Sequence, residues 1–214
     1  MPKPTELYLI RHGETDYNIR SVVQGQLIDC PLNEKGREQA GRLSDALAGV
    51  RIDAFYSSPL RRAVETAKIV FAPHGNPELT LIGDLMEMSF GELEGQPYGG
   101  KNEQLFAELG KRWCSGVFSD RPGGGESILD VQRRSIRSIE KIVMQNPGRT
   151  VAVVTHGRLL RVLLSTLLDG YSLETMEKLL HRNTAYSRIV VDNGNFEPLL
   201  LATDEHLSDS VPTT

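Results

Sequence analysis

The sequence has few cysteines, few aromatic residues and no long apolar run. Only 2 of its 214 residues are cysteines, and Cys30 and Cys114 lie far apart and outside any C-x-x-C motif. This excludes a disulfide framework and a cysteine-based zinc site, and it fits the reduced thiols of a cytoplasmic protein. The most apolar helix candidate, 159–168, is too short to span a bilayer and carries Arg161. The opening residues MPKPTE contain no apolar region of the kind a signal peptide has, so we expect no signal peptide.

An excess of charge of one sign is also missing. Lys and Arg number 24 against 28 Asp and Glu, which gives a net charge of −4. This balance gives no reason to expect nucleic acid or an anionic membrane as a partner. A chain of this length buries roughly 70% of its unfolded surface, so its core needs no disulfide or metal. We find no internal repeat and no linker, and therefore expect a single domain over residues 1–214.

Several motifs of metal and nucleotide chemistry are absent, namely H-E-x-x-H, G-x-S-x-G and the calcium-binding loop. The segment GQPYGGKN (95–102) does have the G-x-x-x-x-G-K spacing of a phosphate-binding P-loop. However, Asn102 stands where that motif needs Ser or Thr, and the preceding FGELE does not predict a buried strand. Because the P-loop requires a strand before it and a helix after it, we interpret 95–102 as a flexible loop.

Short apolar runs alternate along the chain with amphipathic helix patterns. The strand-like runs lie at 7–10, 52–57, 79–82, 150–155, 187–192 and 199–202. The helical patterns lie at 34–49, 61–71, 127–145, 158–168 and 172–180. This alternation predicts an α/β fold with a mainly parallel sheet between helical layers. Only NGN (193–195) separates the last two strands, which predicts a hairpin and an antiparallel edge strand.

Local signals add detail to this outline. Asn33 is expected to cap the helix that follows it, and Ser127 and Asp130 resemble a capping box. The segment 83–125 is glycine-rich and poorly periodic. We therefore expect it to make a long excursion over the edge of the sheet, of the kind that often shapes an active site.

Residues suited to binding an anion follow three of the predicted strands. Arg11 and His12 come directly after the first run, and His156 comes directly after the fourth. A lone histidine at a strand end is more often structural. Two histidines at strand ends favour a functional site, because the carboxyl ends of parallel strands lie at one edge of a sheet. The helix after the second run begins with Arg61 and Arg62, against the helix dipole, which makes sense if an anion binds there.

Six blocks along the chain share the pattern of one protein family. They are LIRHGETDYN (9–18), QGQLIDCPLNEKGREQA (24–40), SSPLRRAVETA (57–67), LMEMSFGELEG (85–95), GGES (124–127) and VVTHG (153–157). In this order they resemble the histidine phosphatase superfamily, which includes the cofactor-dependent phosphoglycerate mutases. The resemblance covers nearly the whole chain and implies a three-layer α/β/α sandwich.

The resemblance also implies roles for individual residues. His12 matches the nucleophile that becomes phosphorylated, while Arg11, Arg62 and His156 match the residues that bind the phosphoryl oxygens. Elementary chemistry agrees, since the planar fork of arginine fits phosphate geometry. A histidine must be neutral to attack phosphorus, and two neighbouring arginines disfavour its protonation. These cations can take the charge role of a metal ion, so we expect neither a metal nor another cofactor.

Further site residues follow from the same resemblance. Glu87 matches the general acid and base, which protonates the leaving alkoxide and then deprotonates the attacking water. Asn18 and the turn formed by Gln24 and Gly25 fall where the family lines its phosphate pocket. Without the resemblance, Glu87 would be interpreted as a surface carboxylate on a loop.

Phosphatase and mutase share this pocket, so its surroundings must decide between them. The mutases carry basic and aromatic residues after the glutamate, whereas MSF (88–90) supplies no positive charge here. A second phosphate would lack partners there, and an unpaired anion is costly to bury. The long insertion usual in mutases is also missing. We therefore favour a metal-independent phosphatase of small phosphomonoester metabolites, with a mutase or a non-catalytic phospho-ligand binding protein as alternatives.

The nature of the substrate is less constrained. RNTAYSRI (182–189) and TDEHL (203–207) resemble segments of phosphoserine phosphatases, in which a terminal His-Leu closes over the substrate. This resemblance makes His206 and Leu207 candidates for contact with the substrate's tail. Phe90 is a third candidate, because it stands where those enzymes often place a histidine. Phosphoserine, ribazole phosphates and sugar phosphates stay open, as does a homodimer.

Overall fold

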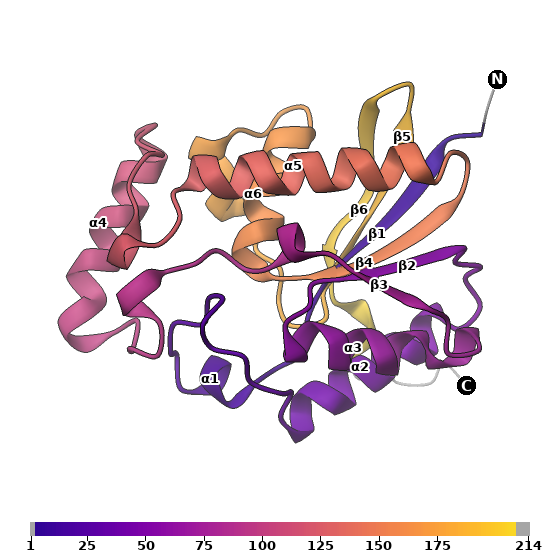
Figure 1. Ribbon diagram of the computed structural model, residues 1–214, viewed down its shortest axis with the longest axis horizontal. Helices are drawn as coiled ribbons and strands as arrows, with labels where there is room; N and C mark the ends of the chain where they lie inside the picture. Colours follow the sequence, from indigo (N-terminus) through magenta and orange to yellow (C-terminus); the bar gives the residue numbers. More distant parts are fainter. Residues whose placement is uncertain (1–2, 209–214) are drawn as a thin grey trace.

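A six-stranded sheet forms the centre of the computed structural model, which describes residues 3–208 (Figure 1). The strands are β1 (Thr5–Arg11), β2 (Ala54–Ser57), β3 (Leu79–Leu81), β4 (Thr150–Thr155), β5 (Tyr186–Asp192) and β6 (Asn195–Thr203). Their order in the sheet is β3-β2-β4-β1-β5-β6. The first four run parallel, while β5 runs antiparallel to β1 and β6 runs antiparallel to β5. The prediction of a mainly parallel sheet with an antiparallel edge strand is confirmed.

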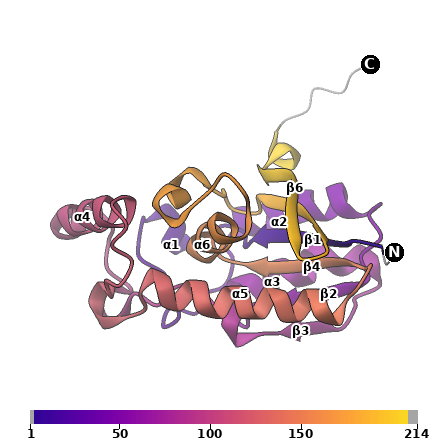
Figure 2. The same ribbon diagram turned by 90° about the horizontal axis from the view of Figure 1, so that it is seen from above.

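Helices cover both faces of this sheet and make the three layers. They are α1 (Asp16–Ile19), α2 (Glu34–Leu47), α3 (Arg61–Phe71), α4 (Glu103–Cys114), α5 (Ile128–Gln145) and α6 (Gly157–Leu167). Figures 1 and 2 show α2 and α3 on one face and α5 and α6 on the other. The expected α/β/α sandwich is therefore confirmed.

The core explains why β4 is apolar at almost every position. Ala152 and Val154 pack into the cluster beneath α2 and α3, whereas Val151 and Val153 pack into the cluster beneath α5 and α6. Successive side chains of a strand point to opposite faces, so a central strand covered on both sides needs apolar residues throughout.

The predicted helix starts are confirmed at the level of single hydrogen bonds. The Asn33 side chain accepts a hydrogen bond from the backbone N–H of Gly36 at 2.7 Å. At the start of α5, Ser127 accepts from the N–H of Asp130 at 3.2 Å, and the Asp130 carboxylate accepts from the N–H of Ser127 at 2.9 Å. This is a complete capping box.

Two segments differ from expectation. The excursion 83–125 contains a helix that the sequence analysis missed, α4, which stands at the left of Figure 1. The segment expected to be a helix at 172–180 is instead a 3-10 helix over Leu173–Lys178. That segment is too short to gain from the cooperativity that stabilises an α-helix, so the tighter turn is adopted. The loop interpretation of 95–102 agrees with the structure, because no strand precedes its short 3-10 turn Gly100–Asn102.

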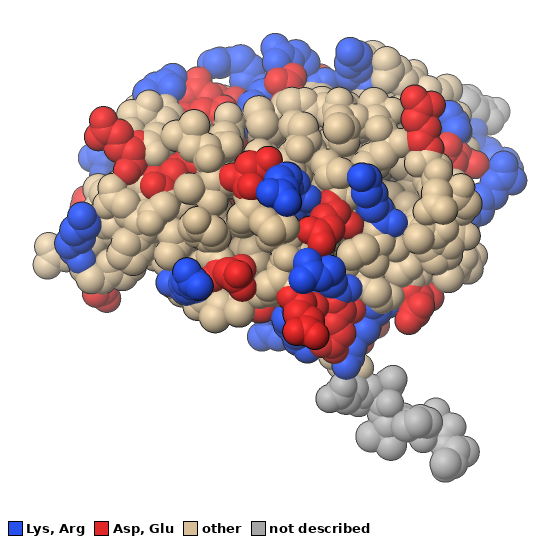
Figure 3. Space-filling model, turned by 60° about the horizontal axis from the view of Figure 1, so that its bottom comes forward, with Lys and Arg blue, Asp and Glu red and all other residues tan. Residues whose placement is uncertain are grey.

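The surface carries both signs of charge. On the face shown in Figure 3, acidic and basic side chains are mixed over the α2 and α3 side of the molecule. Between residues 3 and 208, no helix combines the length and the apolar character needed to cross a membrane. The expected cytoplasmic location, the absence of a nucleic-acid partner and the open question of a homodimer are not tested by the fold.

Candidate active site

The two histidines that follow β1 and β4 meet at one edge of the sheet. β1 and β4 are parallel neighbours, and Arg11 lies opposite Thr155 in their register. In Figure 2 both strands point toward the side on which α1, α4 and α6 lie. His12 follows β1 directly and His156 follows β4 directly. Their rings therefore lie side by side, with centroids 5.1 Å apart.

His12 is oriented as a nucleophile requires. Its Nδ1 lies 2.7 Å from the carbonyl oxygen of Gly13. Since a carbonyl only accepts, Nδ1 carries the hydrogen and Nε2 of the neutral ring keeps its lone pair. Burial lowers the pKa of His12 well below 6.5, and the charges of Arg62 and Arg11 lower it further. The ring is therefore neutral near pH 7.

Arg62 rather than Arg61 faces this site. Arg62 is fully buried, and its guanidinium donates to the carbonyls of Ile28 at 2.8 Å and Gly25 at 3.0 Å. Its Nε has no partner among residues 3–208 and is left for a ligand. Arg61 is exposed at the start of α3, where its backbone N–H donates to Asp29. The two carbonyls hold the Arg62 fork in place before any ligand binds.

Arg11 is held in a similar way. Its Nη1 donates to the carbonyl of His181 at 2.6 Å, while its buried Nε lacks a partner in the described part of the chain. Burial lowers the pKa of Arg11 to about 10, so the side chain stays protonated at neutral pH. A Cβ at Gly157 would lie 3.2 Å from that Nε. The glycine after His156 therefore makes room for Arg11.

Ser58 fixes the second histidine. Its Oγ lies 2.8 Å from Nε2 of His156 and accepts from the N–H of Leu60 at 3.3 Å. The hydroxyl hydrogen is then free to be donated to Nε2, which leaves the hydrogen of the neutral imidazole on Nδ1. Nδ1 is buried and has no partner among the residues that the structure describes. Sequence reasoning missed Ser58, although it is the second residue of the SSPLRRA block.

Replacing Ser58 with alanine is expected to lower kcat roughly 10- to 100-fold, because His156 loses the partner that sets its tautomer. The measurement is steady-state hydrolysis of p-nitrophenyl phosphate. Ser138→Ala is the matched control, since Ser138 is also buried and its Oγ has no hydrogen-bond partner within residues 3–208. Equal rates for the two variants would contradict this role of Ser58.

Glu87 lies beside His156 at the start of α6. Its Oε1 accepts from the N–H groups of Met88 at 2.9 Å and Leu159 at 3.0 Å, and its Oε2 accepts from the N–H of Arg158 at 3.0 Å. The N-cap residue His156 makes no side-chain capping bond, so Glu87 supplies the cap from a distant segment. The carboxylate is thereby fixed at the same edge of the sheet as the histidines.

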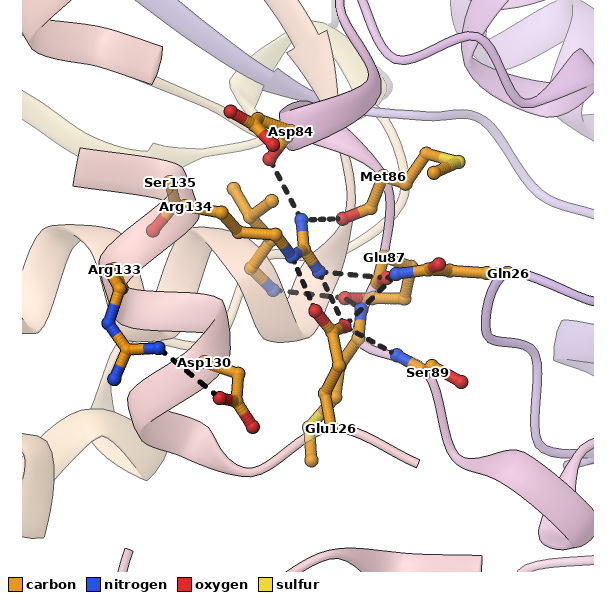
Figure 4. Close-up of polar contacts among 12 residues, drawn as sticks. Gln26, Asp84, Met86, Glu87, Ser89, Glu126, Asp130, Arg133, Arg134 and Ser135 are labelled. Carbon is orange, nitrogen blue, oxygen red and sulfur yellow. Dashed lines mark hydrogen bonds and ion pairs between the residues drawn. The ribbon is translucent and has the colours of Figure 1, made fainter. Parts of the chain in front are cut away.

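Arg134 clamps the segment that carries Glu87 (Figure 4). This largely buried arginine of α5 donates to the carbonyls of Asp84, Met86 and Glu87. It also forms an ion pair with Glu126 at 2.8 Å. Sequence reasoning missed Arg134, whereas its neighbour Arg133 is exposed. The missed signal is that Arg134 follows Val131 by three residues on the apolar stripe of the helix.

The predicted pocket-lining residues Asn18, Gln24 and Gly25 lie in the same network. The side-chain oxygens of Asn18 and Gln24 accept from Thr15, at 3.1 Å from its N–H and 2.9 Å from its Oγ1 respectively. The carbonyl of Gly25 accepts from Arg62. Since the amide oxygens are satisfied inside the protein, the NH₂ groups of Asn18 and Gln24 are the parts free to donate to a phosphoryl oxygen.

A small cavity of about 110 Å³ opens beside Glu87. Its lining residues are Arg11, Glu87, Phe90, Tyr98, Gly157, Arg158 and Arg161. Phe90 is thus brought to the site, as proposed for the substrate's tail. Sequence reasoning missed Tyr98, Arg158 and Arg161. The available signal was that Arg158 and Arg161 are three residues apart, on one face of the helix that begins after His156.

The C-terminal candidates lie next to this cavity rather than in it. Leu207 lines a separate depression of about 380 Å³ that also reaches Arg11. The Nε2 of His206 lies 2.9 Å from Oγ1 of Thr184, and its ring packs near Tyr186. Within residues 3–208, His206 lines neither cavity. Its contact with a substrate stays a prediction.

Positive charge at this site comes from arginine side chains. Arg11 and Arg62 flank the histidines, and Arg158 and Arg161 extend the charge along α6. Over the range 3–208, no group of three or more His, Cys, Asp or Glu side chains is arranged to hold a metal ion.

The buried histidines make stability depend on pH. Burial lowers the pKa values of His12 and His156 well below 6.5 and that of His181 to about 4. Below pH 6.5 the unfolded chain binds protons that the folded chain does not, so the free energy of unfolding falls as pH falls. Each such histidine contributes a slope approaching about 1.4 kcal/mol per pH unit.

Urea unfolding at pH 7.5, 6.5 and 5.5 measures this dependence. The expected result is a free energy of unfolding that declines below pH 6.5, and a shallower decline in His12→Ala. An unchanged free energy between pH 7.5 and 5.5 would show that these rings are not held neutral.

Comparisons with known proteins agree with this geometry. The family model of the histidine phosphatase superfamily (branch 1) matches residues 7–204. A phosphoglycerate mutase-like protein 4 of Arabidopsis thaliana is 34% identical over 186 residues, covering 86% of this chain and 79% of that protein. A metal-independent phosphoserine phosphatase of the same plant is 37% identical over 174 residues, covering 78% of this chain and 71% of that protein.

A solved structure is similar over almost the full length. The phosphoserine phosphatase of Entamoeba histolytica, in complex with 3-phosphoglyceric acid, has a TM-score of 0.83 with 29% sequence identity. The match covers 95% of this chain and 100% of that one. Since the family model matches residues 7–204, this chain belongs to branch 1 of the histidine phosphatase superfamily.

Proposed function

We propose that this protein is a phosphatase that hydrolyses a small phosphomonoester through a phosphohistidine at His12. The observation that carries the proposal is the surroundings of that ring. Arg11, Arg62 and His156 each keep a buried nitrogen without a partner in the described chain, and the charges of Arg11 and Arg62 act on His12. A phosphoryl group is the ligand that such a set of donors satisfies.

These groups support a reaction in two steps. Nε2 of His12 attacks phosphorus, the bond from phosphorus to the leaving oxygen breaks, and the protonated carboxyl group of Glu87 gives that oxygen its proton and becomes a carboxylate. Water then attacks the phosphohistidine, Glu87 takes the proton from the water, and the P–N bond breaks to release phosphate. Each preorganised donor around the phosphoryl oxygens contributes roughly 3 kcal/mol to the transition state.

The relatives support a phosphatase and keep a mutase as the second candidate. A metal-independent phosphoserine phosphatase and a phosphoglycerate mutase-like protein resemble the chain to a similar degree. The sequence argument against a mutase was that a second phosphate lacks partners beside residues 88–90. Arg158 and Arg161 line the cavity and place positive charge elsewhere beside Glu87, so the argument from residues 88–90 does not decide the question alone. Phosphoserine stays a candidate substrate.

Phosphate release separates the two functions. We expect free phosphate from phosphoserine and from p-nitrophenyl phosphate in the presence of EDTA, because arginines and not a metal neutralise the phosphoryl charge. Conversion of 3-phosphoglycerate to 2-phosphoglycerate should be negligible with 2,3-bisphosphoglycerate supplied. Conversion well above the rate of hydrolysis would favour the mutase, and loss of phosphate release in EDTA would contradict the metal-independent mechanism.

A further inference from the structure

A second pair of cations lies beside the phosphoryl site. Arg158 and Arg161 project from one face of α6 into the cavity that also contains Glu87 and Arg11. Each has only 17% of its side chain exposed. Long cationic side chains are rarely this buried without a partner, so their charge balance is informative.

One carboxylate serves both arginines. Glu177 forms ion pairs with Nη1 of Arg158 and with Nη1 of Arg161, one through each of its oxygens. The trio therefore carries one net positive charge. The Nε of Arg161 is buried and has no partner within residues 3–208. A partly buried cation with an unsatisfied donor is costly unless a ligand supplies the missing acceptor.

Packing against a tryptophan holds the Arg158 side chain in place. The guanidinium of Arg158 lies over the ring of Trp113, 4.8 Å from its centroid. Trp113 is buried in α4, the helix of the excursion 83–125. Cation–π stacking of this kind fixes the plane of the guanidinium, so little side-chain freedom remains to be lost when an anion binds.

Volume and charge together limit what can bind. The cavity measures about 110 Å³, well below the 300–1,000 Å³ typical of pockets for drug-sized ligands. One net positive charge matches a monoanion such as a carboxylate, whereas a second phosphate dianion would leave negative charge uncompensated. A carboxylate also matches the planar fork of arginine.

We propose that Arg158 and Arg161 form a subsite for a carboxylate of the substrate, so that the substrate is a short phosphorylated carboxylic acid. This inference rests on the proposed function, because it places the phosphate of the same molecule at His12. Phosphomonoesters whose tail is neutral lack the group that this subsite binds.

A matched pair of compounds tests the subsite. 3-Phosphoglycerate and glycerol 3-phosphate have the same carbon chain and phosphate position, and differ in a carboxylate against a hydroxymethyl group. The measured quantity is the ratio of their kcat/KM values. We expect the wild type to favour the carboxylate at least tenfold, and Arg161→Gln to reduce that preference about tenfold. Arg133→Gln, an exposed arginine of α5, is the control and should leave the ratio unchanged.

A second variant changes the charge in the opposite direction. Glu177→Gln removes the carboxylate that offsets one of the two arginine charges, so the preference for 3-phosphoglycerate should rise rather than fall. If the trio had only a structural role, both substitutions would change the preference for 3-phosphoglycerate in the same direction. No carboxylate preference in the wild type, or parallel changes in Arg161→Gln and Glu177→Gln, would overturn the inference.

Binding without turnover separates this inference from the proposed function. Calorimetry on His12→Ala with the same two compounds should again show tighter binding of 3-phosphoglycerate. If that preference is present while the wild type releases no phosphate, the subsite stands and the phosphatase proposal fails. If the wild type hydrolyses both compounds equally and His12→Ala binds them equally, the subsite is wrong and the phosphatase proposal stands.

Discussion

Replacing His12 with alanine is expected to lower kcat for phosphomonoester hydrolysis by roughly 10⁴-fold or more, as removal of a catalytic nucleophile does elsewhere. His12 provides the lone pair that attacks phosphorus, and its Nδ1 is committed to the carbonyl of Gly13. The neighbouring His156 cannot replace it, because its Nε2 is engaged with Ser58. Phosphate release from p-nitrophenyl phosphate measures the effect.

The control for this substitution is another histidine. His74→Ala changes a partly buried ring that packs against Phe55 beyond the C-terminal end of α3, at the opposite end of that helix from Arg62. It should leave kcat within about twofold of the wild type. A His12→Ala variant that keeps a tenth or more of the activity would mean that water or another residue attacks phosphorus directly.

The second large effect concerns two adjacent arginines. Arg62→Ala is expected to lower kcat/KM by about 10²- to 10³-fold, because it removes a preorganised donor to the phosphoryl oxygens. Arg61→Ala should matter little, since Arg61 is exposed at the start of α3. The measurement is steady-state hydrolysis of phosphoserine by both variants.

Stability must be measured alongside these rates. Arg62 donates to the carbonyls of Ile28 and Gly25, so its loss leaves two acceptors unpaired and should also lower the melting temperature. Arg62→Lys keeps a charge but loses the fork, and we expect it to remain far below the wild type. Comparable losses in kcat/KM for Arg61→Ala and Arg62→Ala would show that the wrong arginine has been assigned to the pocket.

Much of the fold is predictable because its signals are local. β4 is apolar throughout since both its faces are covered, and the capping residues Asn33 and Ser127 mark their helices directly. The helix α4 was not predicted, although Leu109 and Trp113 are spaced to lie on one face of it. Gly110 and the glycine-rich stretch before it weaken the local helix signal, so packing against neighbouring segments decides its conformation.

The site likewise contains residues that the sequence predicts and residues that it does not. Arg11, His12 and His156 could be placed from the sequence, because strand ends of a parallel sheet meet at one edge. Ser58 and Arg134 act through contacts between residues that are 98 and about 50 positions apart in the chain. No spacing rule in the sequence encodes such contacts, which arise only when the layers pack together.

The most direct test of the account is to locate the phosphate on the enzyme during turnover. The wild type is mixed with ³²P-labelled phosphoserine, quenched within milliseconds and digested under alkaline conditions, in which phosphohistidine survives. We predict base-stable, acid-labile phosphate on the peptide that contains His12, and none on that peptide from His12→Ala. Turnover with no labelled peptide, or with label on another residue, would contradict a phosphohistidine at His12.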